Sequence, residues 1–202
     1  MSVSYLNPKK SPKPKPTEHA LPDFDSFVAV DLETTGLSDK DEIIEFGAVR
    51  ITKGKFDGYF SSLVCPARPI SPRTAEITGI TQALVNDAPE CYEVLPEFLK
   101  FVGNSILVGH NILRFDSKFL LRDSAKYGYS LKNSMFDTLS YARKVNSKIQ
   151  LFTALNLTYL TEFFDINVQQ HHRAYEDALA AAHLYFKLRA FETKFCPGGL
   201  NG

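Results

Sequence analysis

The stretch FVAVDLETTGLSDKDEIIEFGAVRIT (27–52) decides the fold. Its first part, FVAVDLE, is a short apolar run that favours β-structure and ends at the turn residues TTG, so it predicts a strand. Its last part, EIIEFGAVRIT (42–52), and the following KFDGYFSSLVC (55–65) predict two more strands, which Lys53 and Gly54 join by a tight turn.

The rest of the chain predicts helices alternating with short buried strands. Ser71 caps the first of these helices and Pro72 lies in its first turn. Helices are expected at 71–80, 91–103, 115–128, 138–145, 154–164 and 174–195, and strands at 105–110 and 134–137. Three strands followed by this alternation predict an α/β domain with a mixed sheet.

Length and composition are those of a single globular domain. The chain has 202 residues, of which 44% are apolar. It contains no run of about 18 apolar residues, so no membrane-spanning helix is predicted. The N-terminus lacks the apolar core of a secretory signal, so a cytoplasmic protein is expected. With 23 basic and 23 acidic residues the net charge is zero, which argues against a nucleic-acid binder held by bulk charge. An enzyme that grips a few nucleotides at one end stays compatible with that balance.

Both ends of the chain are predicted to lie outside the domain. Residues 1–23 form a Lys/Pro-rich tail that cannot bury enough surface to fold, and residues 196–202 form a flexible tail, which leaves 24–195 as the domain. The three cysteines, Cys65, Cys91 and Cys196, lack any metal-binding spacing and are expected to be buried structural thiols.

Two carboxylates close the first predicted strand. Asp31 and Glu33 are two residues apart, so they point to the same face of the strand while Leu32 faces the core. Adjacent like charges are unfavourable unless cations lie between them, and hard oxygen ligands favour Mg²⁺ or Mn²⁺. The alternative is a strand end whose acids simply face water. The backbone N–H groups of the following Thr34, Thr35 and Gly36 are candidates to contact a terminal sugar or phosphate.

Two further patches carry residues of the same chemistry. Asp116 begins a predicted helix, and the alternative is that it only interacts favourably with the helix dipole. For Asn111 the alternative is that it is only a turn residue. His172 lies on a loop just before the helix that carries Asp177, and an imidazole near neutrality suits a general base. A solvent-exposed loop histidine is the alternative. Each patch alone is ambiguous, whereas the three in order indicate metal-dependent phosphodiester hydrolysis.

The three patches together resemble the DEDDh exonucleases, the 3′–5′ exonuclease superfamily that includes the proofreading subunit of bacterial DNA polymerase III. The resemblance rests on VDLETTGL (30–37), DEIIEFGAV (41–49), EITGIT (76–81), VGHNILRFDSKFL (108–120) and HHRAYEDALAAAHLY (171–185). It implies that residues 24–195 form an exonuclease domain of the RNase H-like fold, with a central five-stranded mixed sheet flanked by helices. One departure is an extra residue between Asn111 and Phe115, which puts assignment to the bacterial proofreading branch in doubt.

The resemblance also implies a mechanism and a set of partners. Asp31, Glu33, Asp116 and Asp177 would hold two divalent metal ions, Mg²⁺ or Mn²⁺, and His172 would take the proton from the attacking water. Contacts to the terminal nucleotide would come from Leu32, Thr34, Thr35, Ile80, Asn111 and Phe115, with Leu37, Ile80 or Phe115 against the base.

The substrate implied is the 3′ end of single-stranded or frayed DNA, which would release nucleoside 5′-monophosphates in proofreading or repair, with a polymerase or repair partner. Three alternatives stay open: a 3′–5′ exoribonuclease, a catalytically silent docking module and a phosphohydrolase acting on small nucleotides.

Overall fold

The structure is a computed structural model that describes residues 24–169 and 172–195. The predicted tails, 1–23 and 196–202, and with them Cys196, lie outside the described residues, as does His171. Within the described part of the chain, no helix has both the length and the apolar character needed to cross a membrane.

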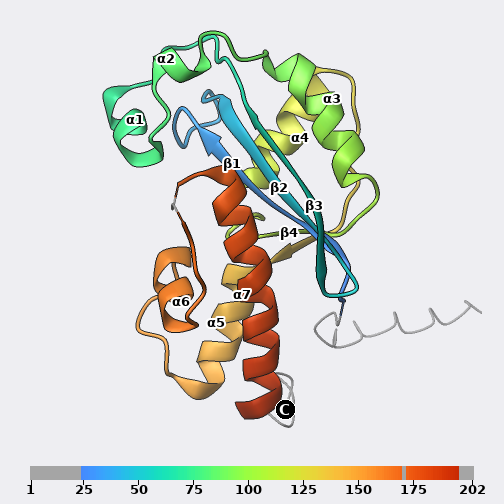
Figure 1. Cartoon of the computed structure of the whole chain (residues 1–202), viewed down its shortest axis with the longest axis vertical. Helices are drawn as coiled ribbons and strands as arrows, with labels where there is room; N and C mark the ends of the chain where they lie inside the picture. Colours follow the sequence, from blue (N-terminus) through green and yellow to red (C-terminus); the bar gives the residue numbers. More distant parts are fainter. Residues whose placement is uncertain (1–23, 170–171, 196–202) are drawn as a thin grey trace, which may run out of the picture.

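A five-stranded mixed sheet forms the centre of the domain, as the sequence predicted (Figure 1). Its strands are β1 (Phe27–Thr34), β2 (Ile43–Thr52), β3 (Lys55–Leu63), β4 (Leu107–Gly109) and β5 (Met135–Asp137), in the order β3-β2-β1-β4-β5. The first three strands pair antiparallel, whereas β4 pairs parallel with β1 and β5 pairs parallel with β4. The turn between β2 and β3 is the predicted one, with Lys53 and Gly54 both at positive φ (51° and 72°).

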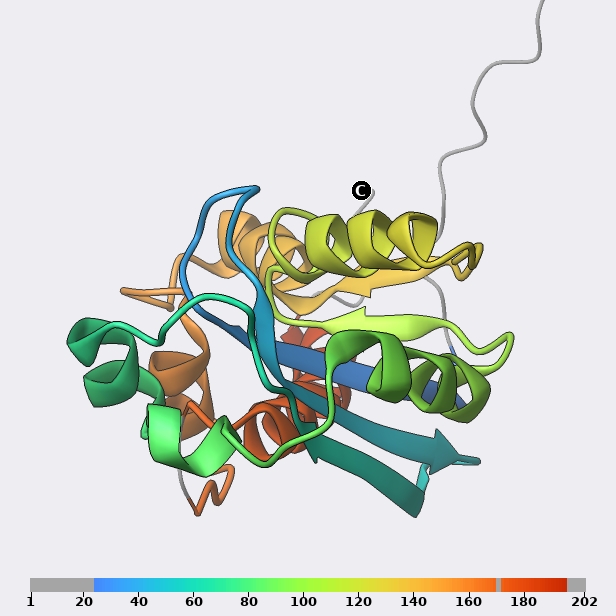
Figure 2. The same cartoon turned by 90° about the horizontal axis from the view of Figure 1, so that it is seen from above.

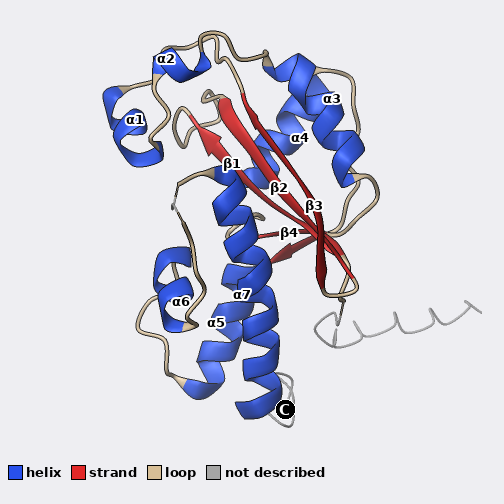
Figure 3. Cartoon of the chain, in the orientation of Figure 1, coloured by secondary structure: helices blue, strands red, loops and turns tan. Residues whose placement is uncertain are grey.

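Helices cover both faces of the sheet (Figure 2). They are α1 (Pro72–Thr78), α2 (Gln82–Val85), α3 (Cys91–Val102), α4 (Asp116–Lys126), α5 (Thr138–Ile149), α6 (Leu157–Phe163) and α7 (Ala174–Phe195). One core joins the sheet to α3 and α4, and the other joins it to α5, α6 and α7. The short helices α1 and α2 lie beyond the end of β1 (Figure 3).

The alternation of side chains along β1 decides which face receives the acidic residues. Val28, Val30 and Leu32 pack in the core shared with α3 and α4, whereas Phe27 and Ala29 pack in the core shared with α7. Because alternate residues share a face, Asp31 and Glu33 project toward α7 at the end of the strand.

The predicted elements are present, with one addition. Most have shorter bounds than predicted, whereas α5 continues to Ile149, past the predicted end at Val145. Ser71 caps α1 by accepting a hydrogen bond from the Thr74 backbone N–H at 3.0 Å, as expected, and α2 is a further helix that the pattern did not predict. The helix expected at 154–164 begins only at Leu157, because the Asn156 side chain accepts from the Tyr159 N–H at 2.8 Å and so acts as its cap. The expectation of buried thiols is wrong for the two described cysteines, Cys65 and Cys91, which are free and only half-buried.

Candidate active site

A cavity of about 510 Å³ opens at the carboxyl ends of β1 and β4. Its walls come from the end of β1, the helix α1, the loop after β4 and the starts of α4 and α7. The four predicted metal ligands and the predicted base all line it: Asp31, Glu33, Asp116, His172 and Asp177. The fold therefore gathers three patches that are far apart in the sequence into one site.

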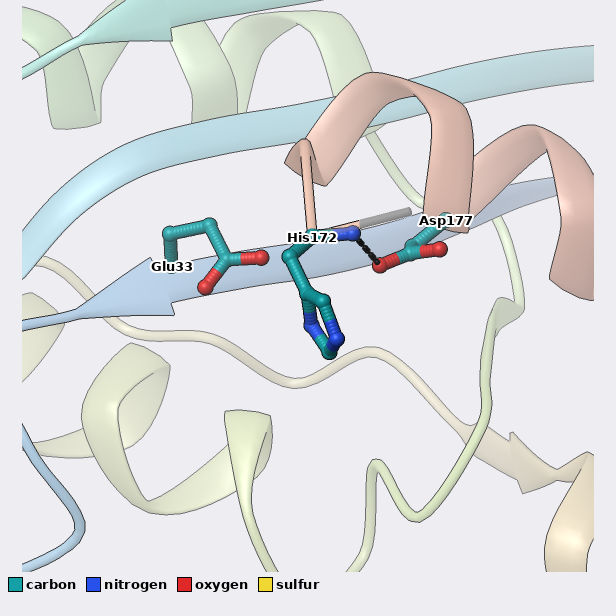
Figure 4. Close-up of side chains that lie close together, drawn as sticks. All are labelled: Glu33, His172 and Asp177. Carbon is teal, nitrogen blue, oxygen red and sulfur yellow. Dashed lines mark hydrogen bonds between the residues drawn. The ribbon is translucent and has the colours of Figure 1, made fainter. Parts of the chain in front are cut away.

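The β1 carboxylates lie on the wall that faces α7. Glu33 is only 9% exposed, Asp31 is half-buried, and Leu32 between them is 3% exposed and part of the core, as the alternation predicted. An oxygen of Glu33, a ring nitrogen of His172 and an oxygen of Asp177 all lie within 4.8 Å of one another (Figure 4). Such a separation allows one ion to contact all three groups.

Asp116 reaches this wall from the opposite side of the sheet. It is the first residue of α4 and is 2% exposed, and its Oδ1 accepts a hydrogen bond from the Leu32 backbone N–H at 3.1 Å. The loop that delivers it makes a sharp turn: Asn111 has a positive φ of 70°, and a Cβ on Gly109 would lie 3.0 Å from the Val30 carbonyl oxygen. Asp116 thus does more than interact with a helix dipole, because it binds the strand that carries the other two acids.

Asp177 and His172 arrive together at the start of α7. Asp177 is 7% exposed, and its Oδ2 accepts a hydrogen bond from the His172 backbone N–H at 2.9 Å (Figure 4). His172 is exposed and has a φ of 61°, a conformation that residues other than glycine seldom adopt. The tight turn therefore brings the imidazole back beside Asp177 and Glu33.

The electrostatics of the cluster favour a cation. Burial, together with the charges of Asp177, Glu45 and Asp116, raises the pKa of Glu33 to about 8. Burial also raises the pKa of Asp116 to about 7 and, with the repulsion of Asp116 and Asp177, holds the pKa of Asp31 well above its usual range. Carboxylates that resist ionisation in one another's presence become ionised when a divalent ion neutralises them. The donor set, which is mostly carboxylate oxygen, fits Mg²⁺ or Mn²⁺.

The turn after β1 uses much of its own hydrogen-bonding capacity. The Thr34 hydroxyl donates to the Gly36 carbonyl oxygen at 2.6 Å, and the Thr35 hydroxyl donates to Asp41 Oδ1 at 3.1 Å. The Thr35 backbone N–H donates to the Glu42 carbonyl oxygen at 2.8 Å. The expectation that this N–H contacts a sugar or phosphate is therefore wrong, although Thr34 and Thr35 both line the cavity.

The structure corrects one position on the apolar side of the cavity. Ile80 is 1% exposed and packs with Ile44 and Val85 in a small core cluster, away from the cavity wall. The helix α1 ends at a left-handed Gly79 (φ 69°), which turns Ile80 inward, and Ile77 lines the cavity instead with 49% of its surface exposed. Helical spacing from Thr74 was the signal in the sequence that could have identified Ile77.

The remaining predicted contacts do line the cavity. Leu37 stands on its rim with 82% of its surface exposed, and Phe115 and Asn111 form part of its wall. His110 lines the cavity too, but both its nitrogens are engaged, Nε2 donating to the Leu155 carbonyl oxygen at 2.9 Å and Nδ1 bonding the Thr138 hydroxyl at 3.0 Å. Burial lowers the pKa of His110, so this neutral imidazole holds the wall together.

A buried carboxylate cluster with an adjacent histidine, at the ends of parallel strands, defines an α/β protein with a site of the hydrolase type. Residues 28–185 match the family model of the exonucleases (RNase T). The chain therefore belongs to this exonuclease family and is a nuclease, as the motifs predicted.

Individual relatives agree with this assignment. The chain is 38% identical over 182 residues to the DNA polymerase III subunit epsilon of Aquifex aeolicus, which covers 89% of this chain and 88% of that protein. It is 42% identical over 163 residues to the DNA polymerase III PolC-type of Caldanaerobacter subterraneus, which covers 80% of this chain and 11% of that protein. The chain thus spans about a tenth of the length of the PolC-type relatives it matches.

Solved structures share the fold. Exonuclease X in complex with 5′ overhanging duplex DNA aligns with a TM-score of 0.65 at 28% identity, over 82% of this chain and 92% of that one. Exonuclease I of E. coli in complex with a dT13 oligonucleotide aligns with a TM-score of 0.74 at 19% identity, over 85% of this chain and 42% of that one. The fold is therefore RNase H-like, as predicted.

Proposed function

We propose that this exonuclease is a two-metal-ion 3′–5′ enzyme that hydrolyses the terminal phosphodiester of single-stranded or frayed DNA and releases nucleoside 5′-monophosphates. The observation that carries the proposal is the convergence of Asp31, Glu33, Asp116, Asp177 and His172 on one cavity. A docking module that had lost catalysis would not need to keep four mutually repelling carboxylates in one place.

The carboxylates are the proposed ligands of the ions. Two divalent ions held by Asp31, Glu33, Asp116 and Asp177 would supply Lewis-acid stabilisation of the attacking water and of the leaving 3′ oxygen. The Leu32 N–H bond to Asp116 and the His172 N–H bond to Asp177 fix the orientation of two of the four carboxylates.

His172 is the proposed general base. Its ring nitrogen lies within 4.8 Å of oxygens of Glu33 and Asp177, so a water held at these carboxylates is within reach of the imidazole. Histidine is the side chain best suited to accept a proton near neutral pH. The exposed position of His172 at the cavity mouth also lets the proton pass on to solvent.

The apolar wall of the cavity is the proposed seat of the terminal base. Leu37 and Ile77, which are exposed, and the half-buried Phe115 offer apolar surface to the cavity. Packing against such surface accepts any base, because every base has an apolar face. The cavity volume of about 510 Å³ lies in the range of sites that enclose one small ligand, which favours attack on the last nucleotide of a strand.

DNA is the proposed substrate because the similar proteins are DNA polymerase III subunits and exonucleases solved in complex with DNA. The polymerase III relatives and the DNA complexes of Exonuclease X and Exonuclease I support a role in proofreading or repair, with a polymerase as the partner. A location in the cytoplasm is part of the proposal, because it is consistent with an enzyme that acts on DNA.

The test is digestion of matched 3′-labelled and 5′-labelled oligonucleotides of DNA and of RNA, with Mg²⁺ or Mn²⁺. A metal-dependent ladder that shortens from the 3′ end of DNA, absent with EDTA and with Asp31→Ala, is expected. A ladder on RNA alone would replace the DNA assignment with an exoribonuclease. Absence of cleavage of either polymer would sink the proposal.

A further inference from the structure

The start of α7 presses unusually closely against β2. A Cβ added to Gly47 would lie 2.0 Å from the carbonyl carbon of Ala174 and 2.3 Å from the backbone nitrogen of Tyr175. Gly47 is the β2 residue paired with Asp31 across the sheet. Glycine at this position therefore lets the first turn of α7, which carries Asp177, approach β2 next to the strand that carries Asp31 and Glu33.

A buried glutamate fixes this turn in place. Glu45, which pairs with Glu33 across the two strands, is 1% exposed, and its carboxylate accepts hydrogen bonds from the Arg173 side chain and the Ala174 backbone. Arg173 Nη2 and Nε donate to Glu45 Oε1 at 2.7 and 3.1 Å, and the Ala174 N–H donates to Oε2 at 3.0 Å. Both oxygens are thus engaged, so Glu45 is held away from the ligand set although it neighbours Glu33.

The same contacts constrain His172, which lies just before α7, and Asp177 in its first turn, and both of these residues line the cavity. Arg173 directly follows His172, whose positive φ is a strained conformation that needs support from its neighbours. The Arg173 carbonyl oxygen accepts from the Asp177 N–H at 3.0 Å, and Asp177 Oδ2 accepts from the His172 N–H. The ion pair to Glu45 therefore anchors a closed loop of bonds that includes the proposed base and a proposed ligand.

We propose that Glu45 and Arg173 are positioning residues of this site: their ion pair holds the start of α7 so that His172 and Asp177 face Glu33 and Asp31. The inference rests on the proposed function for its link to catalysis. Neither residue touches the reacting atoms in this role. Each acts through the segment that it anchors.

The experiment compares the native chain with Arg173→Gln, Arg173→Lys, Glu45→Gln and the double variant Glu45→Gln/Arg173→Gln. Arg50→Gln is the matched control. Arg50 is an arginine of β2 whose side chain donates a hydrogen bond to the Phe101 carbonyl oxygen, but it does not line the cavity. Three quantities are measured for each: the thermal midpoint, kcat and KM on a 3′-labelled DNA oligonucleotide, and the affinity for Mn²⁺ by calorimetry.

Arg173→Gln is expected to lower kcat and the Mn²⁺ affinity by about 10–100-fold, the range for groups that orient metal ligands, while KM stays near the native value. Arg173→Lys is expected to recover part of both losses, since it keeps the charge and one donor. The double variant is expected to lose little more than either single variant, because the two residues act as one unit. Arg50→Gln is expected to lower the thermal midpoint without changing Mn²⁺ affinity or kcat.

Mn²⁺ affinity and kcat at the native level in Arg173→Gln would overturn the positioning role, and so would equal losses in Arg50→Gln. A native chain that binds Mn²⁺ but cleaves nothing would overturn the proposed function alone, and the Mn²⁺ titrations of the variants would still decide the positioning role. A native chain that does not bind Mn²⁺ would overturn both.

Discussion

Removing the charge of Glu33 should stabilise the metal-free protein at alkaline pH. The carboxyl of an unfolded glutamate titrates near 4.5, whereas burial and the charges of Asp177, Glu45 and Asp116 raise the pKa of Glu33 in the folded protein to about 8. Between these two values the folded state holds a proton that the unfolded state has released. Stability therefore falls as the pH rises through this window.

The magnitude follows from the same two values. Each unit of pKa displacement corresponds to about 1.4 kcal/mol, so the raised pKa of Glu33 lowers the free energy of unfolding by about 1 kcal/mol at pH 5 and by about 4 kcal/mol at pH 8. In Glu33→Gln this loss is absent. The native protein should therefore lose about 3 kcal/mol more than Glu33→Gln between these two pH values.

Urea unfolding in EDTA at pH 5 and at pH 8 measures this difference. Comparing each protein with itself at the two pH values cancels any pH-independent cost of the new amide. Glu97→Gln, which neutralises an exposed carboxylate of α3, serves as control and should behave as the native protein does. Saturating Mg²⁺ should abolish the deficit of the native protein at pH 8, since ligands that bind only the folded state stabilise it. A native protein and a Glu33→Gln variant with the same pH dependence would refute the reasoning.

Three further predictions concern the site. Gly47→Ala should lower the free energy of unfolding by at least about 2 kcal/mol, because its Cβ would overlap the Ala174 backbone. Gly54→Ala, whose Cβ meets nothing within 4 Å, should lose only the backbone cost of about 1 kcal/mol, and equal losses by denaturant unfolding would contradict the steric argument. His172→Ala should lower kcat by about 100-fold or more, as expected for loss of a general base, with Mn²⁺ affinity by calorimetry nearly unchanged. Parallel losses of the two would instead make His172 a ligand. Ile77→Ala should raise KM for a DNA oligonucleotide about fivefold, because the base would cover the exposed half of the Ile77 side chain and the variant loses that apolar contact, which contributes about 1 kcal/mol. Ile80→Ala should instead destabilise the protein by about 2–5 kcal/mol without raising KM, and the reverse pattern would restore Ile80 to the pocket.

The local elements followed from the sequence because their causes are local. The alternation in FVAVDLE put Leu32 in the core and Asp31 and Glu33 on one face, because side chains on a strand alternate between faces. Ser71 capped α1 as expected, because a hydroxyl before a helix meets free backbone N–H groups whatever the rest of the fold does. The three acidic patches were also readable, because each lies at the end of an element that a short pattern defines.

Other features depended on the position of one segment relative to another. The sequence suggested the Thr35 backbone N–H as a contact to substrate, but in the folded chain this N–H donates a hydrogen bond to the Glu42 carbonyl oxygen across the loop. Ile77 and Ile80 were equivalent as apolar residues of one motif, and the left-handed turn at Gly79 decided which of them faces the cavity.

The sequence by itself determined the order of strands and helices, the family and the set of residues available for metal chemistry. Only the tertiary structure decided that Glu45 pairs with Arg173, 128 residues away, and that Gly47 admits the α7 backbone beside Asp31. The physical reason is that periodicity and capping depend on neighbours within one element. A salt bridge or a close backbone approach depends instead on strand register and on the distance between packed layers, which no short stretch of sequence encodes.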